Sequence, residues 1–269
     1  MTSTVFSDAQ GPLTDEELKD LKYAKLLLEN PSLAARIASA FGTPIEWALT
    51  RLPDGVQNAI NVATKSAIET SLQFAVTTLE DREQISLDWV HKTAVALAGA
   101  AGGFFGALGL PIELPISTTI MLRSIADIAR SEGEKIATAE SQLACVEVFA
   151  MGGRLPSDDG ANTAYYATRA AMAKAVAQAA AFLAGGGKVG GPAAPALIAL
   201  IAAIAERFGV VVSEKVVAQG LPVIGAAGGA IINTMFIDHF QNTARGHFIV
   251  RRLERKYGEV RVEREYNGS

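Results

Sequence analysis

The chain has 269 residues, of which 49% are hydrophobic and 19% are charged, a balance too apolar for a disordered segment. The formal net charge of −4 argues against general nucleic-acid binding, which needs a basic surface to neutralise phosphates. The single cysteine, Cys145, excludes an intramolecular disulfide and a cysteine-rich metal site. Alanine and glycine supply more than a quarter of the residues, a composition typical of closely packed helices.

Residues 1–31 predict an acidic N-terminal helix at a cytosolic start. No basic segment followed by an apolar stretch opens the chain, so we expect no cleaved secretory signal. Thr14 with Glu17 three residues later is typical of a capping box, and the acids between them suit the positive end of a helix. This helix should stop at Asn30 and Pro31, because proline does not continue a helix.

Residues 32–258 predict one helical domain. The pattern indicates a short helix ending at Phe41, another over 44–51, a break at 53–55 and a long helix ending near 80–81. Because no strand-like alternation exceeds a few residues, we expect an all-α fold, a single compact domain of closely packed, Gly/Ala-rich apolar helices. Residues 259–269 are expected to form a polar C-terminal tail.

Two long runs carry no charge. The first, residues 93–112, would match a bilayer core of about 30 Å as a helix that rises about 1.5 Å per residue. Its glycines weaken that interpretation, because each costs about 1 kcal/mol against alanine inside a helix. The second run, residues 216–237, is interrupted at 220–222. Both runs repeat glycines at a spacing that lets helix backbones approach closely: Gly99 with Gly103, Gly102 with Gly106, and Gly225 with Gly229.

Further helices are predicted between and after these runs. They comprise an alanine-rich helix over 162–184, an apolar helix from 193 to about 208, and a last helix over 225–257. The glycine-rich segment 185–192 formally fits G-x-G-x-x-G, but it follows a helix rather than a strand. We therefore expect a linker there and no nucleotide site.

Catalytic and metal chemistry have little support in the sequence. The neighbours Asp238 and His239 point apart on a helix, and His247 follows eight residues after His239, so these histidines and His91 lack metal-ligand spacing. No G-x-S-x-G motif is present, and Cys145 lies in an apolar helix that favours an inert, buried thiol. We predict no metal site and no cofactor.

The most informative stretch is 111–135, where polar groups interrupt an apolar helix. Pro115 suits the first turn of this helix, and Ser117 or Thr118 could cap it. Four charged residues follow at spacings of four, three and four and should share one helix face with alternating sign: Arg123, Asp127, Arg130 and Glu134.

Three interpretations of this charged face stay open. It could be a surface ladder of ion pairs, each contributing about 0.2 to 0.5 kcal/mol. It could instead be a buried charged layer, because the flanking helices carry little polar surface, and buried charges often mark a ligand site or a switch. The third interpretation is an interface with another protein.

The end of the last predicted helix is basic. Basic residues complement the dipole at a helix C-terminus, and beside an apolar segment they would also attract anionic lipid headgroups, at about 1 kcal/mol per charge. Five residues are candidates for contact with a membrane surface: Arg245, Arg251, Arg252, Arg255 and Lys256.

Two blocks of the sequence resemble the EcsC protein family. They are PISTTIMLRSIADIAR at 115–130 and PVIGAAGGAIIN at 222–233, and the resemblance extends over about residues 50–258. The family is named for a protein encoded beside an ABC-type transporter, so the resemblance implies a link with membrane physiology and supplies no catalytic residues. The candidate binding residues are Glu113, Arg123, Asp127, Arg130, Glu134 and Asn233.

Three functions follow from these observations. The leading hypothesis is a non-enzymatic, cytoplasmic protein at the inner face of a membrane, whose helices dip into the bilayer or enclose a lipid-like ligand, with a lipid surface or a membrane protein as partner. The alternative is an enzyme of unrecognised class that uses the charged face with Glu113, provided that these side chains converge with Asn233 or His239 on one cavity. The third is a soluble helical bundle that binds partners.

Overall fold

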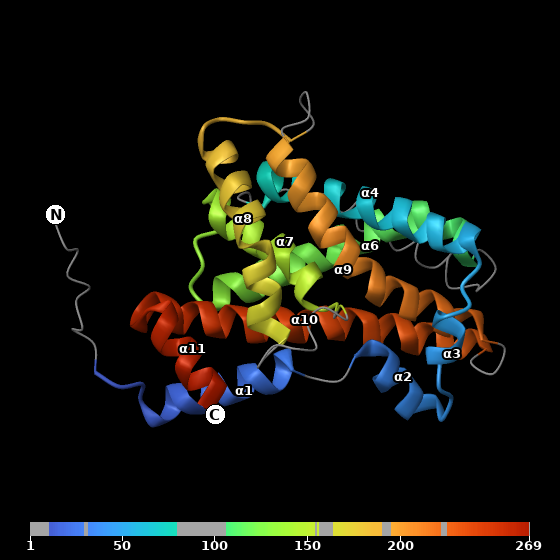
Figure 1. Ribbon diagram of the computed structural model, residues 1–269, viewed down its shortest axis with the longest axis horizontal. Coiled ribbons are helices and arrows are strands. Elements are labelled where there is room, and N and C mark those ends of the chain that lie inside the picture. The colour runs from blue at the N-terminus through green and yellow to red at the C-terminus, as the bar shows by residue number, and fades with distance from the viewer. Residues whose placement is uncertain are drawn as a thin grey trace.

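Every regular element in the described part of the chain is an α-helix, as the sequence predicts. The computed structural model describes residues 11–29, 32–79, 106–153, 155, 164–189, 195–221 and 225–268. The helices shown in Figure 1 are α1 (Asp15–Leu28), α2 (Leu33–Phe41), α3 (Glu46–Leu49), α4 (Asp54–Thr78), α6 (Gly106–Ser131), α7 (Ala139–Met151), α8 (Ala164–Ala184), α9 (Pro195–Gly220), α10 (Gly225–Tyr257) and α11 (Glu259–Gly268). They pack together as one compact domain, which confirms the predicted fold class.

Side-chain caps begin the first two helices, and the first of these caps is the one that the sequence predicts. The Thr14 hydroxyl accepts a hydrogen bond from the Glu17 N–H, and the Glu17 carboxylate accepts one from the Thr14 N–H at 3.0 Å, which confirms the capping box. The Ser32 hydroxyl caps α2 in the same way as Thr14 caps α1. The N–H of Ala34 on α2 donates to the buried Glu214 carboxylate of α9 at 3.0 Å, so this acid ties α2 to α9.

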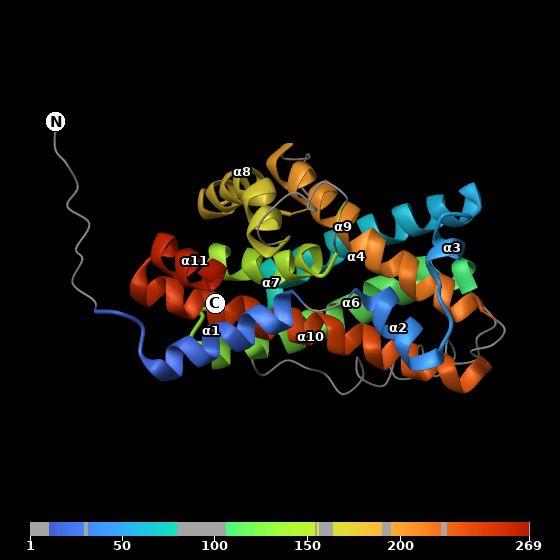
Figure 2. The same cartoon turned by 60° about the horizontal axis from the view of Figure 1, so that its bottom comes forward.

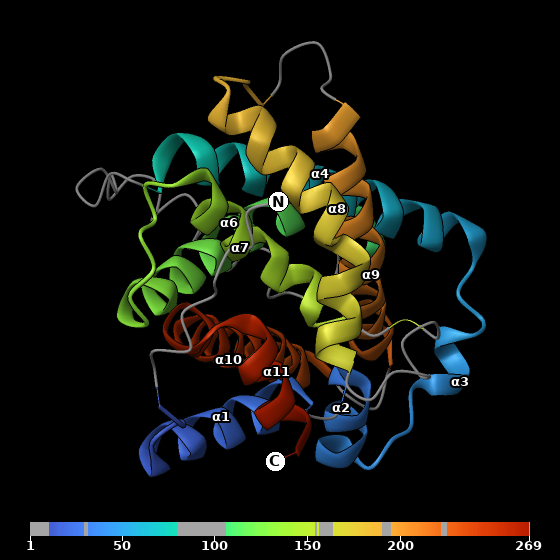
Figure 3. The ribbon, with the colours of Figure 1, turned by 60° about the vertical axis from the view of Figure 1, so that its left-hand side comes forward.

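Helix α7 lies at the centre of the protein. Every one of its side chains from Ser141 to Met151 is buried. A helix that is buried all round must be enclosed by other helices, and α4, α6, α8, α9 and α10 all contact α7. Figure 3 shows α7 inside this ring of helices. Its polar residues, Glu147 among them, are therefore forced into the interior.

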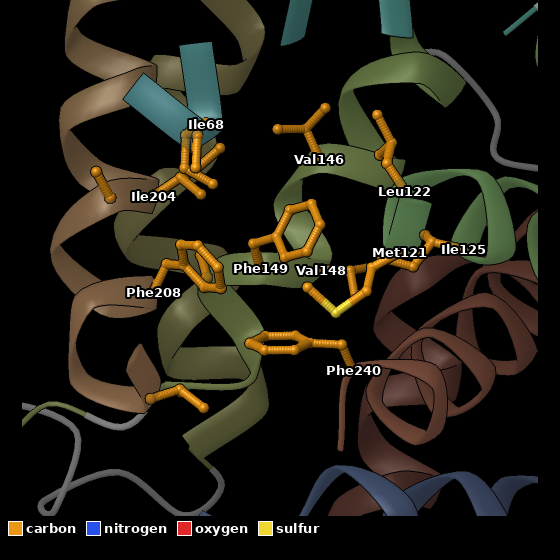
Figure 4. Close-up of a cluster of buried hydrophobic side chains, with 14 of the residues drawn as sticks. Ile68, Met121, Leu122, Ile125, Val146, Val148, Phe149, Ile204, Phe208 and Phe240 are labelled. Atoms are coloured by element: carbon orange, nitrogen blue, oxygen red, sulfur yellow. The ribbon is translucent and has the colours of Figure 1, made fainter. Parts of the chain in front are cut away.

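Three phenylalanines join α7 to its neighbours α9 and α10. The ring centres of Phe149, Phe208 and Phe240 lie 5.2 to 5.4 Å apart in the tilted and edge-to-face arrangements that aromatic rings prefer. Figure 4 shows this junction with Met121 and Ile125 of α6 beside it. Four helices thus meet in one close-packed centre.

Helix α10 spans the length of the molecule and carries a second hydrophobic cluster at its C-terminal end. Figures 1 and 2 show α1 alongside α10, and α11 beside the last turns of α10. The second cluster is separate from the main core and comprises Leu13, Leu21, Ala24, Leu28, Met151, Tyr165, Tyr166, Ile249, Val250, Leu253, Val262 and Tyr266.

Two helix boundaries near the family blocks differ from the sequence prediction. Because α6 starts at Gly106, Pro115 lies in its interior rather than in its first turn. The hydroxyls of Ser117 and Thr118 donate to the Leu114 carbonyl within the helix instead of capping it. The apolar helix predicted to end near 208 continues as α9 as far as residue 220.

The expected polar tail is a helix over nearly all of its length. Residues 259–268 form α11, and its Val262 and Tyr266 side chains are fully buried. These two residues are four positions apart and lie on one face of the helix. Because most residues of this segment are polar, its composition predicts a tail and does not reveal the narrow apolar face.

The two uncharged runs do not form single described helices. Residues 93–105 of the first run lie outside the described residues, and the second run is divided between α9, which ends at 220, and α10, which begins at 225. Among the described helices, α9 alone is long and apolar enough to cross a membrane, with a mean hydropathy of 2.0 in its best window. Since 56% of that window is buried inside the protein, packing against neighbouring helices accounts for its apolar character.

The close approach of α10 to a neighbour occurs at Gly246, not at the predicted Gly229. A Cβ at Gly246 would lie 2.9 Å from the Ala24 carbonyl oxygen and 2.7 Å from a side-chain carbon of Leu28, both on α1. At Gly229 no described atom lies within 4 Å of such a Cβ. The spaced glycines at 99–103 lie outside the described residues.

We expect Gly246→Ala to lower the free energy of unfolding by about 2 kcal/mol, because the added methyl group overpacks the contact with α1. The matched control is Gly229→Ala in the same helix, which should raise stability by up to about 1 kcal/mol through helix propensity. Urea unfolding of both variants measures the difference, and equal stability of the two would contradict the close approach.

Candidate functional site

Helix α10 carries a row of polar side chains at intervals of four residues. We call His239, Thr243, His247, Arg251 and Arg255 the polar row. Residues at this spacing form a ridge that packs against neighbouring helices. The first three side chains are buried, Arg251 is half-buried and Arg255 is exposed, so the row leads from the interior to the surface.

The inner end of the polar row holds the C-terminus of α7. A ring nitrogen of His239 lies 2.8 Å from the Gly152 carbonyl oxygen, and the Thr243 hydroxyl donates to the His239 carbonyl at 2.9 Å. Gly153, which follows Gly152 at the end of α7, packs very closely on α9. A Cβ at Gly153 would lie 2.0 Å from the Arg207 carbonyl oxygen. Glycine is therefore required at this meeting of three helices.

In the middle of the row, His247 meets Tyr165 of α8. The Tyr165 hydroxyl lies 2.9 Å from His247 Nδ1, and the other ring nitrogen, Nε2, is buried without a hydrogen-bond partner in the described part of the chain. Burial, with the nearby charges of Arg251 and Arg169, holds the pKa of His247 well below its usual value. Burial also raises the pKa of the Tyr165 phenol, so neither ring carries a charge near neutral pH.

Arg169 of α8 forms the main ion pair beside this contact. Its two terminal nitrogens lie 2.6 and 3.1 Å from the two carboxylate oxygens of Glu254, the bidentate geometry in which arginine binds carboxylates most strongly. The guanidinium also lies over the rings of Tyr165 and Tyr166, 5.4 and 5.5 Å from their centres. Arg169 thus fixes α8 to the end of α10 through the ion pair with Glu254, while its ring contacts lie within α8.

Glu134 closes the outer end of the polar row. Its side chain is 3% exposed, and its carboxylate accepts hydrogen bonds from Arg251 Nε at 2.8 Å, from Arg255 and from the Ser141 hydroxyl at 2.8 Å. Burial alone would raise the pKa of this carboxyl, but the hydrogen bond and the charge of Arg251 outweigh it and lower the pKa. Glu134 is therefore a charged anchor between the loop after α6 and α10.

The pKa of Glu147 on α7 is raised by its surroundings. Its side chain is buried, and burial raises its pKa from 4.5 to about 7, although the charges of Arg251 and Arg169 act in the opposite direction. The exposed Glu140 raises it further. The pKa of this carboxyl thus lies much closer to neutral pH than that of an exposed glutamate.

The sequence-predicted charged face is not continuous. α6 ends at residue 131 because Gly133 takes a left-handed φ of 80°, and the N–H groups of residues 133 and 134 bond back to the carbonyls of 130 and 129. Asp127 and Arg130 form a surface pair at 2.6 Å, with Asp127 71% exposed, as the ladder interpretation expects. Arg123 lies over the Phe74 ring of α4. Glu134, in contrast, is buried against α10, as the buried-layer interpretation expects.

The remaining predicted binding residues lie elsewhere. Glu113 accepts a hydrogen bond from the fully buried Lys215 of α9 at 2.9 Å, and the Lys215 ammonium lies over the Phe236 ring. Asn233 is half-buried on α10, one turn before Phe236. Glu113 and Glu134 thus bind different partners on different helices, and His239 contacts the end of α7. The proposed convergence on one cavity has no support among these contacts.

The basic cluster predicted for a membrane surface is mostly paired within the protein. Arg251 binds Glu134 and Glu140, Arg252 binds Asp20 and Glu132, and Lys256 binds Glu17. Arg255 also binds Glu134, and Arg245 donates to Asn242. The sequence could not show that these carboxylates, most of them distant along the chain, supply the counter-charges.

The residues that sequence reasoning missed are Glu147, Tyr165, Arg169 and Glu254. A signal for their neighbour His247 was present, because the eight-residue interval from His239 is close to two helical turns and keeps both histidines on one side of α10. No sequence signal linked this side of α10 to Tyr165, since contact across 82 positions depends on the packing of α8.

This arrangement can exchange a proton and hold helices in place. The described residues contain no group of three or more His, Cys, Asp or Glu side chains that could hold a metal ion. Nearly every charged residue of the site has an opposite charge beside it, which is how buried charges are accommodated. The contacts form a network that joins α7, α8, α10 and the loop after α6.

Fold and site together define an all-helical domain organised around a buried central helix and a paired polar row. The model of the EcsC protein family matches residues 16–253, which is nearly the whole chain. The chain belongs to the EcsC protein family. No curated protein and no solved structure matches it.

Glu134→Ala should destabilise the protein by about 3 kcal/mol, because it removes the buried partner of Arg251 and leaves this half-buried arginine with only the exposed Glu140 at 3.4 Å. Asp127→Ala, which removes an exposed acid of the same predicted charged face, is the control and should cost less than about 1 kcal/mol. Chemical unfolding at pH 7 measures both values. A loss at Glu134 no larger than that at Asp127 would show that the buried pair does not hold the loop to α10.

Glu147 should make the protein less stable as the pH rises from 5 to 8. The unfolded state releases this proton near pH 4.5 and the folded state near pH 7, so the folded state binds more protons between these values and loses about 3 kcal/mol of stability across them. Glu147→Gln should remove this contribution and leave only that of Glu214, whose pKa burial also raises to about 7, whereas Glu140→Gln, at a 74% exposed position of the same helix, should retain most of the Glu147 contribution. Unfolding free energies at pH 5 and 8 test this difference.

Proposed function

We propose that this protein is a peripheral membrane protein that contacts the bilayer through one apolar end and has no enzymatic activity of its own. Trp47 of α3, Ile112 of α6 and Ile231 of α10 are 55%, 71% and 50% exposed. Figures 1 and 2 both show α3 and the first turns of α6 and α10 at the same end of the molecule. The placement at one end of three helix segments that each carry a large exposed apolar side chain is the observation that supports the proposal.

The chemistry of this apolar end suits the interface between lipid and water. Tryptophan is enriched at membrane interfaces, because its ring is apolar and its N–H remains polar. The Arg51 guanidinium lies 6.0 Å from the centre of the Trp47 ring, so a cation accompanies the aromatic group at the level where lipid headgroups would lie. Isoleucines beside it would enter the acyl boundary.

A peripheral contact agrees better with the described residues than a spanning helix does. α9, the apolar helix of sufficient length, is held in the core by α4, α7 and α8. The basic residues 251–256 are paired with carboxylates, so the apolar end, rather than this basic cluster, would supply the binding energy.

Vesicle flotation tests the proposal. The unmodified protein should float with phosphatidylcholine vesicles, and the double variant Trp47→Ser/Ile112→Ser should bind at least tenfold more weakly, because each apolar group contributes roughly 1.5 to 3 kcal/mol when buried. Adding anionic phosphatidylserine or salt should change the binding less than about twofold, since the basic cluster is paired.

The matched control is Val260→Ser on α11, where the side chain is 72% exposed at the other end of the molecule. This variant should float like the unmodified protein. A protein that stays with the soluble fraction in all conditions, or that loses binding equally at Val260 and at Ile112, would refute the apolar end as the membrane contact.

A further inference from the structure

Helix α11 lies beyond the residues that match the family, yet it covers residues inside that match. The family model ends at 253, and α11 begins after Gly258, whose left-handed φ of 84° turns the chain. The buried residues of α11 are Val262 and Tyr266. The Tyr266 ring centre lies 5.7 Å from that of Tyr165 and 5.2 Å from that of Tyr166, so the appended helix inserts an aromatic side chain beside the polar row.

Polar contacts fix the direction in which this helix lies. At its C-terminal end, Lys25 Nζ donates to the Tyr266 carbonyl oxygen at 2.8 Å, and the Tyr266 hydroxyl donates to Glu29 at 3.2 Å. At its start, Arg169 lies 3.5 Å from the Glu259 carboxylate. Arg169 thus pairs with the acid at the start of α11, and Lys25 complements the carbonyl at its C-terminal end. We call the surface that receives α11 the α11 groove, formed by Lys25, Glu29, Tyr165, Tyr166 and Arg169.

The structure allows α11 to leave this groove without opening the main core. Val262 and Tyr266 belong to the second cluster, which is separate from the core around α7. A ten-residue helix is marginally stable alone, so α11 depends on the groove for its order. A Cβ at Gly258 would meet no described atom within 4 Å, so a substitution at this turn acts through its left-handed φ and not through a steric clash.

We propose that the α11 groove is an interaction surface for an amphipathic helix of a partner protein, and that α11 is its internal occupant, which the partner displaces. The groove selects a helix with an aliphatic residue and a tyrosine four positions apart, as in Val262 and Tyr266, and with a carboxylate seven positions before the tyrosine, as in Glu259. The partner helix would end with its last carbonyls at Lys25.

Gly258→Ala in the full chain tests the proposal without altering a packed side chain. A residue with a Cβ avoids the left-handed φ, so the substitution shifts α11 towards its undocked state. The probe is a fluorescent peptide of residues 257–269, whose binding is followed by anisotropy. It should bind Gly258→Ala at least tenfold more tightly than the unmodified chain, because apparent affinity falls with the fraction of grooves that are open.

Two controls isolate the groove. Gly42→Ala places the same strain at the end of α2, where φ is 65° and no described atom lies near, and it should leave the peptide affinity at the unmodified level. A peptide with Tyr266→Ala should bind Gly258→Ala at least tenfold more weakly than the peptide that retains the tyrosine. Equal binding of the two peptides, or no gain from Gly258→Ala over Gly42→Ala, would overturn the proposal.

Hydrogen exchange of the unmodified chain decides the question if Gly258→Ala fails to fold. The amides of α11 should exchange by local opening, at a rate independent of low denaturant concentrations and ahead of the amides of α1 and α10. Exchange of α11 only together with those helices would show that α11 is a fixed part of the domain. Unchanged protection of α11 in a folded Gly258→Ala protein would likewise reject the hinge.

Discussion

The burial of α7 on all sides is the constraint on which the rest of this structure depends. Because five helices enclose α7, each must turn one face to it, and the phenylalanine junction of Phe149, Phe208 and Phe240 fills the space between three of them. The same enclosure removes the polar side chains of α7 from water. Glu147 is therefore protonated to a higher pH than an exposed acid, and its charged neighbours must find partners within the protein.

Helix α10 contacts α7, α8 and the loop after α6 through residues of the polar row. His239 holds the end of α7, His247 meets Tyr165 of α8, and Arg251 binds Glu134 in the loop after α6. A single long helix thus fixes the positions of two other helices and of the loop after α6 through interactions that are individually modest. This arrangement explains why basic residues that suggest a membrane-binding surface in the sequence are largely occupied inside the folded chain.

The two ends of the molecule offer different surfaces to the cell. The end at which α10 begins exposes large apolar side chains and carries our proposed contact with lipid. The end at which α10 finishes holds the α11 groove, where tyrosine rings and paired charges receive a short helix. Because the two surfaces share no residue, a peripheral membrane protein built in this way could hold a lipid surface and a protein partner at the same time.

The sequence alone determined the helical class, the cap of the first helix, most helix boundaries and the family, because these depend on periodicity and on residues close together in the chain. It grouped Arg123, Asp127, Arg130 and Glu134 on one face, but the left-handed turn at Gly133 separates the last of them from the helix. Only the tertiary structure decided which charges are buried and paired. Contacts such as Arg251 with Glu134 join residues more than a hundred positions apart, and their distance, burial and pKa exist only once the helices have packed.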